Sequence, residues 1–281
     1  MRLVQFEASD GLRLNGILED TGSDTTIIHV HGKSGNFYEN KFVKVMLEAY
    51  PSGGFNFLSF NNRGHSSYVE AYQKGDIAYI GAAVERFEDC LLDLQAAEQF
   101  ARTFSSRVVM QGHSFGCEKI MYYSQHINPT LDLVLLSPCD GYHLQNIYIE
   151  PETVEEQIVR LRRDYKLEGL EWLPPKEYGI RVSGKEYHVP ITVNALLDLL
   201  TGPAFELLSL DKTWSGPPIA SRSFVYLGGR DGLQIAGVEP MVKELNARFK
   251  DVKVAVFPNG DHHLAPIQRE VIESISSWLR R

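Results

Sequence analysis

The sequence predicts an α/β fold with a mostly parallel central sheet, helices on both of its faces and an inserted segment in its second half. Short apolar or β-branched runs alternate with amphipathic helical stretches along most of the chain, which is the pattern of βαβ units. The run 131–136 is apolar at nearly every position, as expected of a parallel strand covered on both faces. The alternation stops between about 141 and 222. We therefore divide the chain into a core of residues 1–140 and 223–281 and an insertion of residues 141–222.

The first half of the core alternates between strands and helices. Residues 3–19 alternate in polarity around the turn pair Asp10-Gly11 and predict an opening β-hairpin. The elements that follow are, in order, a β-branched strand over 25–30 that leads into a glycine-rich loop, a helix over 39–49, a strand over 55–60 and a long amphipathic helix over 82–103.

The second half of the chain contains the rest of the core and the insertion. In the core the sequence predicts a strand over 108–110, a helix that starts near 117, strands over 131–136, 224–227 and 252–257, and a final helix over 267–281. The insertion is expected to hold an amphipathic helix that Pro151 opens, with Val154, Ile158 and Leu161 on one face, a hairpin of 178–182 and 185–189 around Ser183-Gly184, and an apolar helix over 193–200 that ends at Gly202-Pro203.

Composition excludes several classes of function. The chain has 281 residues, a net charge of −8 and no run of Lys or Arg, so nucleic acid is not expected as its main partner. No apolar stretch approaches the roughly 20 residues that span a bilayer, and the N-terminus lacks the apolar region of a signal peptide. The three cysteines show no CxxC spacing and indicate free thiols rather than disulfides or zinc ligands. We expect a cytoplasmic protein.

The most informative motif is Gly112-His113-Ser114-Phe115-Gly116. It directly follows the strand ending at Met110 and precedes a helical segment that starts at Cys117. A G-x-S-x-G motif between a strand and a helix holds its serine at a strained turn, where the hydroxyl is exposed for nucleophilic attack. A serine hydroxyl is a weak nucleophile, so this chemistry needs a histidine base and a carboxylate that orients the histidine.

Four motifs in this order resemble the α/β-hydrolase superfamily over nearly the whole chain. They are His31-Gly32, the motif around Ser114, Gly228-Gly229-Arg230-Asp231-Gly232 and Gly260-Asp261-His262-His263. The resemblance implies an α/β-hydrolase fold whose insertion is the cap domain. It also implies that Ser114 is the nucleophile, His262 the base and Asp231 the acid.

Two of these assignments have alternatives. His263 is adjacent to His262, and only the Gly-x-His ending of the resemblance separates them. Asp140 follows the strand 131–136, a position that some members of the superfamily use for the acid. Asp261 is expected to shape the loop that carries His262, which we call the histidine loop.

The oxyanion of a tetrahedral intermediate needs two preorganised N–H donors. We expect these donors to be the backbone N–H groups of Phe115 and Lys33. The chain has His-Gly with a single glycine where some esterases have His-Gly-Gly-Gly. We interpret the Lys33 side chain as an exposed loop lysine without a role.

The remaining candidates are interpreted as structural. His29 and His31 are expected to hydrogen-bond the loop, and they lack the further ligands of a metal site. His113 and Cys117 are expected to pack around the sharp turn at Ser114, which we call the elbow. Arg63-Gly64-His65 is expected to form a structural loop. The aromatic residues of the insertion are expected to form its own core, with two or three lining the pocket: Tyr142, Tyr148, Tyr165, Trp172 and Tyr178.

These motifs together predict a serine hydrolase that cleaves a small-molecule carboxylic ester through an acyl-enzyme, without a metal or cofactor. The insertion loosely resembles the cap of esterases that cleave aryl or hydroxycinnamoyl esters, which suggests a medium-sized or aryl substrate. Amidase, thioesterase, lactonase, acyltransferase and carbon–carbon bond hydrolase activities use the same nucleophile and stay open. A non-catalytic binding protein of this fold is a further alternative.

Overall fold

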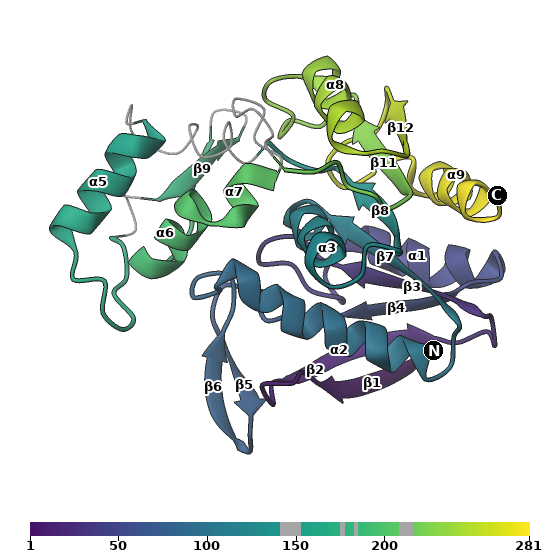
Figure 1. The fold of residues 1–281 in the computed structure, drawn as a ribbon, viewed down its shortest axis with the longest axis horizontal. Helices are drawn as coiled ribbons and strands as arrows, with labels where there is room; N and C mark the ends of the chain where they lie inside the picture. Colours follow the sequence, from purple (N-terminus) through teal and green to yellow (C-terminus); the bar gives the residue numbers. More distant parts are fainter. Residues whose placement is uncertain (141–152, 175–177, 183–184, 208–215) are drawn as a thin grey trace.

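An eight-stranded sheet forms the centre of the computed structural model, which describes residues 1–140, 153–174, 178–182, 185–207 and 216–281 (Figure 1). In spatial order its strands are β1 (Arg2–Glu7), β2 (Arg13–Glu19), β4 (Asn56–Phe60), β3 (Thr25–Val30), β7 (Arg107–His113), β8 (Asp132–Leu136), β11 (Ser223–Gly228) and β12 (Val252–Phe257). Strand β2 pairs antiparallel with β1 and β4, and all other neighbours pair parallel. The predicted mostly parallel sheet is confirmed.

Helices cover both faces of this sheet. On one face lie α1 (Lys41–Ser52) and α9 (Gln268–Leu279); on the other lie α2 (Cys90–Arg102), α3 (Phe115–His126) and α8 (Val238–Arg248). Successive strand residues point to opposite faces, so Ile27 packs with the first group and Ile28 with the second. The two hydrophobic clusters are thus separated by the sheet itself.

The opening hairpin is confirmed, with β1 and β2 paired along their full length and Gly11 at φ 81° in the turn. The sequence predicts a helix over 82–103, and the predicted start of this helix is wrong. It begins at Cys90, after a short 3₁₀ turn, η1 (Phe87–Asp89). The N–H groups of Ala82 and Ala83 bond instead to carbonyl groups of the loop that follows β4, so tertiary hydrogen bonds override the helical pattern there.

A second hairpin, not predicted from the sequence, lies between β4 and α2. Its strands β5 (Val69–Gln73) and β6 (Asp76–Ile80) pair antiparallel around Lys74 and Gly75. Both turn residues have positive φ values, 52° and 83°, as a two-residue hairpin turn requires. The alternation of the two strands and the Lys-Gly pair are the signals that could have revealed it.

The described part of the insertion has a hydrophobic cluster of its own. Its elements are α5 (Val154–Asp164), β9 (Gly179–Val182), β10 (Lys185–His188), α6 (Val193–Thr201) and α7 (Pro203–Leu207). Figure 1 shows α5, α6 and β9 to one side of the sheet, away from α9. Strands β9 and β10 pair antiparallel; the predicted turn at Ser183-Gly184 lies outside the described residues. The limits of the insertion stay a prediction.

Helix α6 is fixed to the segment that precedes α2. The N–H and Oγ1 of Thr192 both donate to the carbonyl oxygen of Ala83, at 2.9 and 3.0 Å. The carboxylate of Asp198 accepts from the N–H of Phe87 at 2.8 Å. These contacts hold α6 against the core, and α7, which follows it, packs against α3. Among the described residues, every helix is too short or too polar to cross a membrane.

Candidate active site

Ser114 occupies a sharp turn between β7 and α3. Its backbone has φ 52° and ψ −126°, and a positive φ is a strained conformation for a residue with a side chain. The turn is held by the Ser114 N–H, which donates to the carbonyl oxygen of Leu136 on β8 at 2.9 Å. Its own carbonyl accepts from the Cys117 N–H at 2.8 Å.

The glycines on either side of this turn are required by close backbone approach. A Cβ on Gly112 would lie 2.3 Å from the carbonyl oxygen of Gly116, and a Cβ on Gly116 would lie 2.2 Å from that of Val30. Either contact would force the backbone apart. The G-x-S-x-G spacing is therefore a packing requirement of the strand–turn–helix junction.

A cavity of about 470 Å³ opens at this turn. The core contributes Lys33, Ser114, Phe115, His262 and His263 to its wall, and the insertion contributes Tyr178, Leu199 and Phe205. Core and insertion thus enclose the cavity together.

His262 and Asp231 form a hydrogen-bonded pair beside the cavity. The distance from His262 Nδ1 to Asp231 Oδ2 is 2.9 Å, and the Asp231 side chain is fully buried. The second carboxylate oxygen accepts from the Leu233 N–H at 2.9 Å. An ionised carboxylate only accepts hydrogen bonds, so Nδ1 carries the proton. Nε2 is left with a free lone pair, as a general base requires.

The two alternative residues occupy different environments. The His263 N–H donates to Asp261 Oδ1 at 2.9 Å, and its ring stacks near Phe42. Burial lowers the pKa of His263. Asp140 is buried and interacts electrostatically with Glu118 and Arg248. Asp231 is the residue that bonds His262.

The Ser114 hydroxyl faces a thiol in this structure. Ser114 Oγ lies 3.6 Å from Cys139 Sγ, within hydrogen-bonding range of sulfur. No hydrogen bond joins the described residues Ser114 and His262, although both line the cavity. Catalytic hydrogen bonds of this kind are often long or poorly aligned without substrate and tighten only when substrate is present.

The N–H groups of Phe115 and Lys33 are both available to a ligand. Phe115 is the first residue of α3, where a helix has no internal partner for its N–H. Within the described part of the chain, neither N–H donates to another residue. The Lys33 loop packs closely on the turn, because a Cβ on Gly32 would lie 2.9 Å from Ser114 Cβ. Both groups lie on the cavity wall with Ser114.

The interpretation of Lys33 as an exposed loop lysine is wrong, because the residue is half-buried. Its Nζ donates to the hydroxyl of Tyr178 at 3.3 Å and lies 5.3 Å from the centre of that ring. The two residues are 145 positions apart. Lys33 thus joins the core loop to the insertion across the cavity.

The aromatic residues of the insertion do not all form its core. Tyr178 is buried and lines the cavity, and Tyr165 packs against the insertion's hydrophobic cluster. Trp172 is 39% exposed and makes a T-shaped contact with Tyr68 of the core. Tyr142 and Tyr148 lie outside the described residues.

Buried histidines support the loops around the site. His31 Nδ1 donates to the carbonyl oxygen of Gly32 at 2.8 Å, and its Nε2 accepts from the Asn62 N–H at 3.2 Å. His29 accepts from Gln111 Nε2 at 3.0 Å. The expected loop contact is observed for His31, whereas His29 bonds a neighbouring strand.

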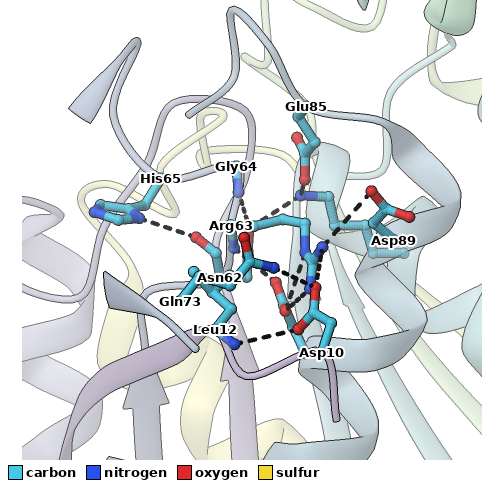
Figure 2. Close-up of polar contacts among 11 residues, drawn as sticks. Asp10, Leu12, Asn62, Arg63, Gly64, His65, Gln73, Glu85 and Asp89 are labelled. Carbon is cyan, nitrogen blue, oxygen red and sulfur yellow. Dashed lines mark hydrogen bonds and ion pairs between the residues drawn. The ribbon is translucent and has the colours of Figure 1, made fainter. Parts of the chain in front are cut away.

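The loop Asn62–His65 is fixed by a buried polar network (Figure 2). The Arg63 guanidinium bonds Asp93 at 2.7 Å and Asp10 at 3.2 Å, and Asp89 lies 3.6 Å away. Figure 2 also shows His65 directed at the backbone oxygen of Asn62, a contact of 3.0 Å. The ion pairs of Arg63 with Asp93 and Asp10 fix this loop to the core, which fits the structural role that the sequence indicates.

Two further residues lie on the cavity wall although the sequence did not predict them there. Cys139 was interpreted only as a free thiol, and Glu118 was not singled out. Helix α3 is buried along most of its length, so any charged residue on it must be paired or face a cavity. That rule is the signal that could have pointed to Glu118. Among the described residues, no group of three or more His, Cys, Asp or Glu side chains is arranged to hold a metal ion.

Known structures share this architecture. Est1E from Butyrivibrio proteoclasticus, solved with bound ferulic acid, superposes with a TM-score of 0.63 at 16% identity over 99% of this chain and 98% of its own. The Pyrococcus furiosus esterase Pf2001 gives a TM-score of 0.62 at 18% identity over 100% and 92%. The chain has an α/β-hydrolase fold. DcsB, solved with a substrate analogue, is similar with a TM-score of 0.67 at 14% identity over 99% and 98%. No protein-family model matches the chain, and no curated protein matches it significantly.

Proposed function

We propose that this α/β-hydrolase-fold protein is a serine hydrolase that cleaves a carboxylic ester through an acyl-enzyme. One observation carries the proposal: a serine on a strained strand–helix turn and a histidine bonded to a buried carboxylate line the same cavity. Few structural roles require that combination, whereas nucleophilic catalysis requires all of it. The esterases among the similar structures support the choice of an ester as substrate.

In the proposed mechanism, Ser114 Oγ attacks the ester carbonyl while His262 Nε2 takes its proton. Asp231 keeps the proton of His262 on Nδ1 and stabilises the imidazolium that forms. The N–H groups of Phe115 and Lys33 bind the oxyanion. His262 then protonates the leaving alcohol. The same histidine next activates a water molecule, which releases the acid and restores Ser114.

We propose that the insertion, residues 141–222, acts as a cap domain that selects the substrate. Its side chains Tyr178, Leu199 and Phe205 line the cavity opposite Ser114. A cavity of about 470 Å³ is in the range of small-molecule sites and suits a medium-sized acyl or aryl ester. The aromatic acid bound to Est1E supports an aryl substrate.

Covalent labelling tests this proposal directly. A fluorophosphonate probe should label the protein once, and peptide mass spectrometry should place the adduct on Ser114. The Ser114→Ala variant should not be labelled, whereas Ser34→Ala, a change at another serine of the cavity wall, should keep the label. Labelling of Ser114→Ala at the wild-type rate would remove Ser114 as the nucleophile.

A further inference from the structure

Glu118 is a buried carboxyl group on the cavity wall that the proposed mechanism does not use. It lies in the first turn of α3, four residues after Ser114, and both residues line the cavity. Glu118 is 3% exposed, and its Oε2 has no hydrogen-bond partner among the residues that the structure describes. Burial of an unpaired polar group costs stability, so a group from outside the chain is expected to pair with it.

The neighbouring residue, Lys119, is a charged group on the same helix that has only a structural role. Lys119 is fully buried, yet its Nζ bonds the Glu85 carboxylate and also Asn62 Oδ1, the latter at 3.0 Å. The described residues therefore supply partners to Lys119 and none to Glu118 Oε2. Glu118 is better explained by a ligand than by packing.

The surroundings of Glu118 favour a cation. The carboxyl groups of Glu118 and Asp140 interact with each other, and both interact with Cys139, the residue beside Ser114 Oγ. On the insertion side the apolar residues Leu199, Ala204 and Phe205 line the wall together with Tyr178 and His188. Of the described residues on the wall, Lys33 is the one with a permanently cationic side chain, and it bonds Tyr178.

We propose that Glu118 determines specificity by binding an organic ammonium group that the ester substrate carries close to its reacting carbonyl. Ser114 and Glu118 line the same cavity, so an ammonium group bound at Glu118 shares that cavity with the carbonyl group that Ser114 attacks. This inference rests on the proposed esterase function and names its substrate class.

A proton leaves Glu118 when the cation binds. Burial raises the pKa of Glu118 to about 8; Lys119 on its own helix acts in the opposite direction, and Asp140 after β8 adds to the rise. The empty site therefore holds the neutral acid at pH 7. Binding of an ammonium group converts it to the carboxylate and releases its proton to solvent.

Two matched ester pairs test the inference. The acyl-side pair is the p-nitrophenyl esters of alanine and of isobutyric acid, which differ by an ammonium group in place of a methyl group. The alcohol-side pair is acetylcholine and 3,3-dimethylbutyl acetate. For each pair the ratio of kcat/KM, cationic over neutral ester, is measured in the wild type, in Glu118→Gln and in Glu239→Gln. Glu239 is exposed at the start of α8, so Glu239→Gln makes the same chemical change away from the cavity.

The ratio for at least one pair should fall tenfold or more in Glu118→Gln and should stay within twofold in Glu239→Gln. Differences in the intrinsic reactivity of the esters cancel, because each ratio is compared between proteins. Ratios that stay within twofold for both pairs in Glu118→Gln overturn the inference. Glu118→Met, with a similar volume, replaces the glutamine variant if that variant does not fold.

A binding measurement separates this inference from the proposed function. If the wild type hydrolyses none of the four esters in a Ser114-dependent manner, the esterase proposal fails. Calorimetric titration with butylammonium then decides the role of Glu118. We expect binding by the wild type with release of a proton at pH 7, and at least tenfold weaker binding by Glu118→Gln. Equal binding by the two proteins, or none by the wild type, contradicts the inference.

Discussion

His113 donates a hydrogen bond from Nε2 to the backbone oxygen of His262, at 2.8 Å. The residue that directly precedes the proposed nucleophile thereby holds the loop of the proposed base. Ser137 Oγ donates to the same oxygen at 3.0 Å. Burial lowers the pKa of His113, so the ring stays neutral. Among the described residues its Nδ1 has no hydrogen-bond partner. The elbow and the histidine loop are therefore positioned as one unit.

The first prediction follows from this contact. His113→Phe keeps the ring volume but removes the donor, and a lost hydrogen bond of about 1 kcal/mol should lower kcat about fivefold. KM should change less than kcat, because His113 acts through His262 and not on the substrate. Steady-state kinetics with one p-nitrophenyl ester measures both constants. A larger change in KM than in kcat would contradict a positioning role.

The second prediction separates the two adjacent histidines. His262→Gln removes the side chain that bonds Asp231, so kcat should fall by about 10³-fold or more. His263→Gln changes a residue that stacks near Phe42 and should lower kcat by less than tenfold. Both variants are compared by kcat at saturating ester, with circular dichroism as the check of folding. The reverse order of effects would make His263 the base.

The third prediction concerns stability in mild acid. Burial lowers the pKa of His29 to about 3 and lowers the pKa values of His31 and His113 well below 6.5. The native state therefore binds fewer protons than the unfolded state below pH 6.5. The contribution of these three histidines to the free energy of unfolding should be constant above that pH and should fall below it by up to about 4 kcal/mol per pH unit.

Urea unfolding between pH 7.5 and 5 measures this dependence. His29→Gln keeps an acceptor for Gln111 and should reduce the slope by about one third. An unfolding free energy that does not change between pH 7 and 5 would show that these histidines are not buried as described.

The fourth prediction concerns Glu118 in the absence of any ligand. Because burial raises its pKa to about 8, the native state holds a proton that the unfolded state releases near pH 4.3. Stability is therefore lost as pH rises from about 4.3 to 8. The stability of Glu118→Gln relative to the wild type should increase by about 1.4 kcal/mol per pH unit in this range. A pH-independent difference in urea unfolding would mean that Glu118 is ionised in the native protein.

The sequence predicts much of this fold because its strands and turns carry local signals. Ser114, Asp231 and His262 each follow a strand of the parallel sheet, and the carboxyl ends of parallel strands lie at one edge. Their proximity could therefore be expected from order along the chain alone. The hairpin at Asp10-Gly11 and the elbow glycines are equally local, since close approach and positive φ values restrict the residue type.

The rest depends on contacts between distant segments. Lys33 and Tyr178 are joined across 145 positions, and no local pattern indicates that pair. Helix α2 starts late because the segment before it bonds the loop after β4 and Thr192. The burial of Glu118 arises from the packing of α3 against the sheet and α7. Sequence periodicity indicates which face of a helix is apolar, but not which charged residue faces a cavity.

The measurement that tests the central claim most directly is hydrolysis of p-nitrophenyl esters from acetate to decanoate, plus one aryl ester, by the wild type and Ser114→Ala. We predict turnover by the wild type with an optimum of acyl length, and loss of that turnover in a folded Ser114→Ala protein. The optimum would give the size of the acyl pocket. Equal turnover by the two proteins, or none by a folded wild type on any ester, would contradict a serine esterase.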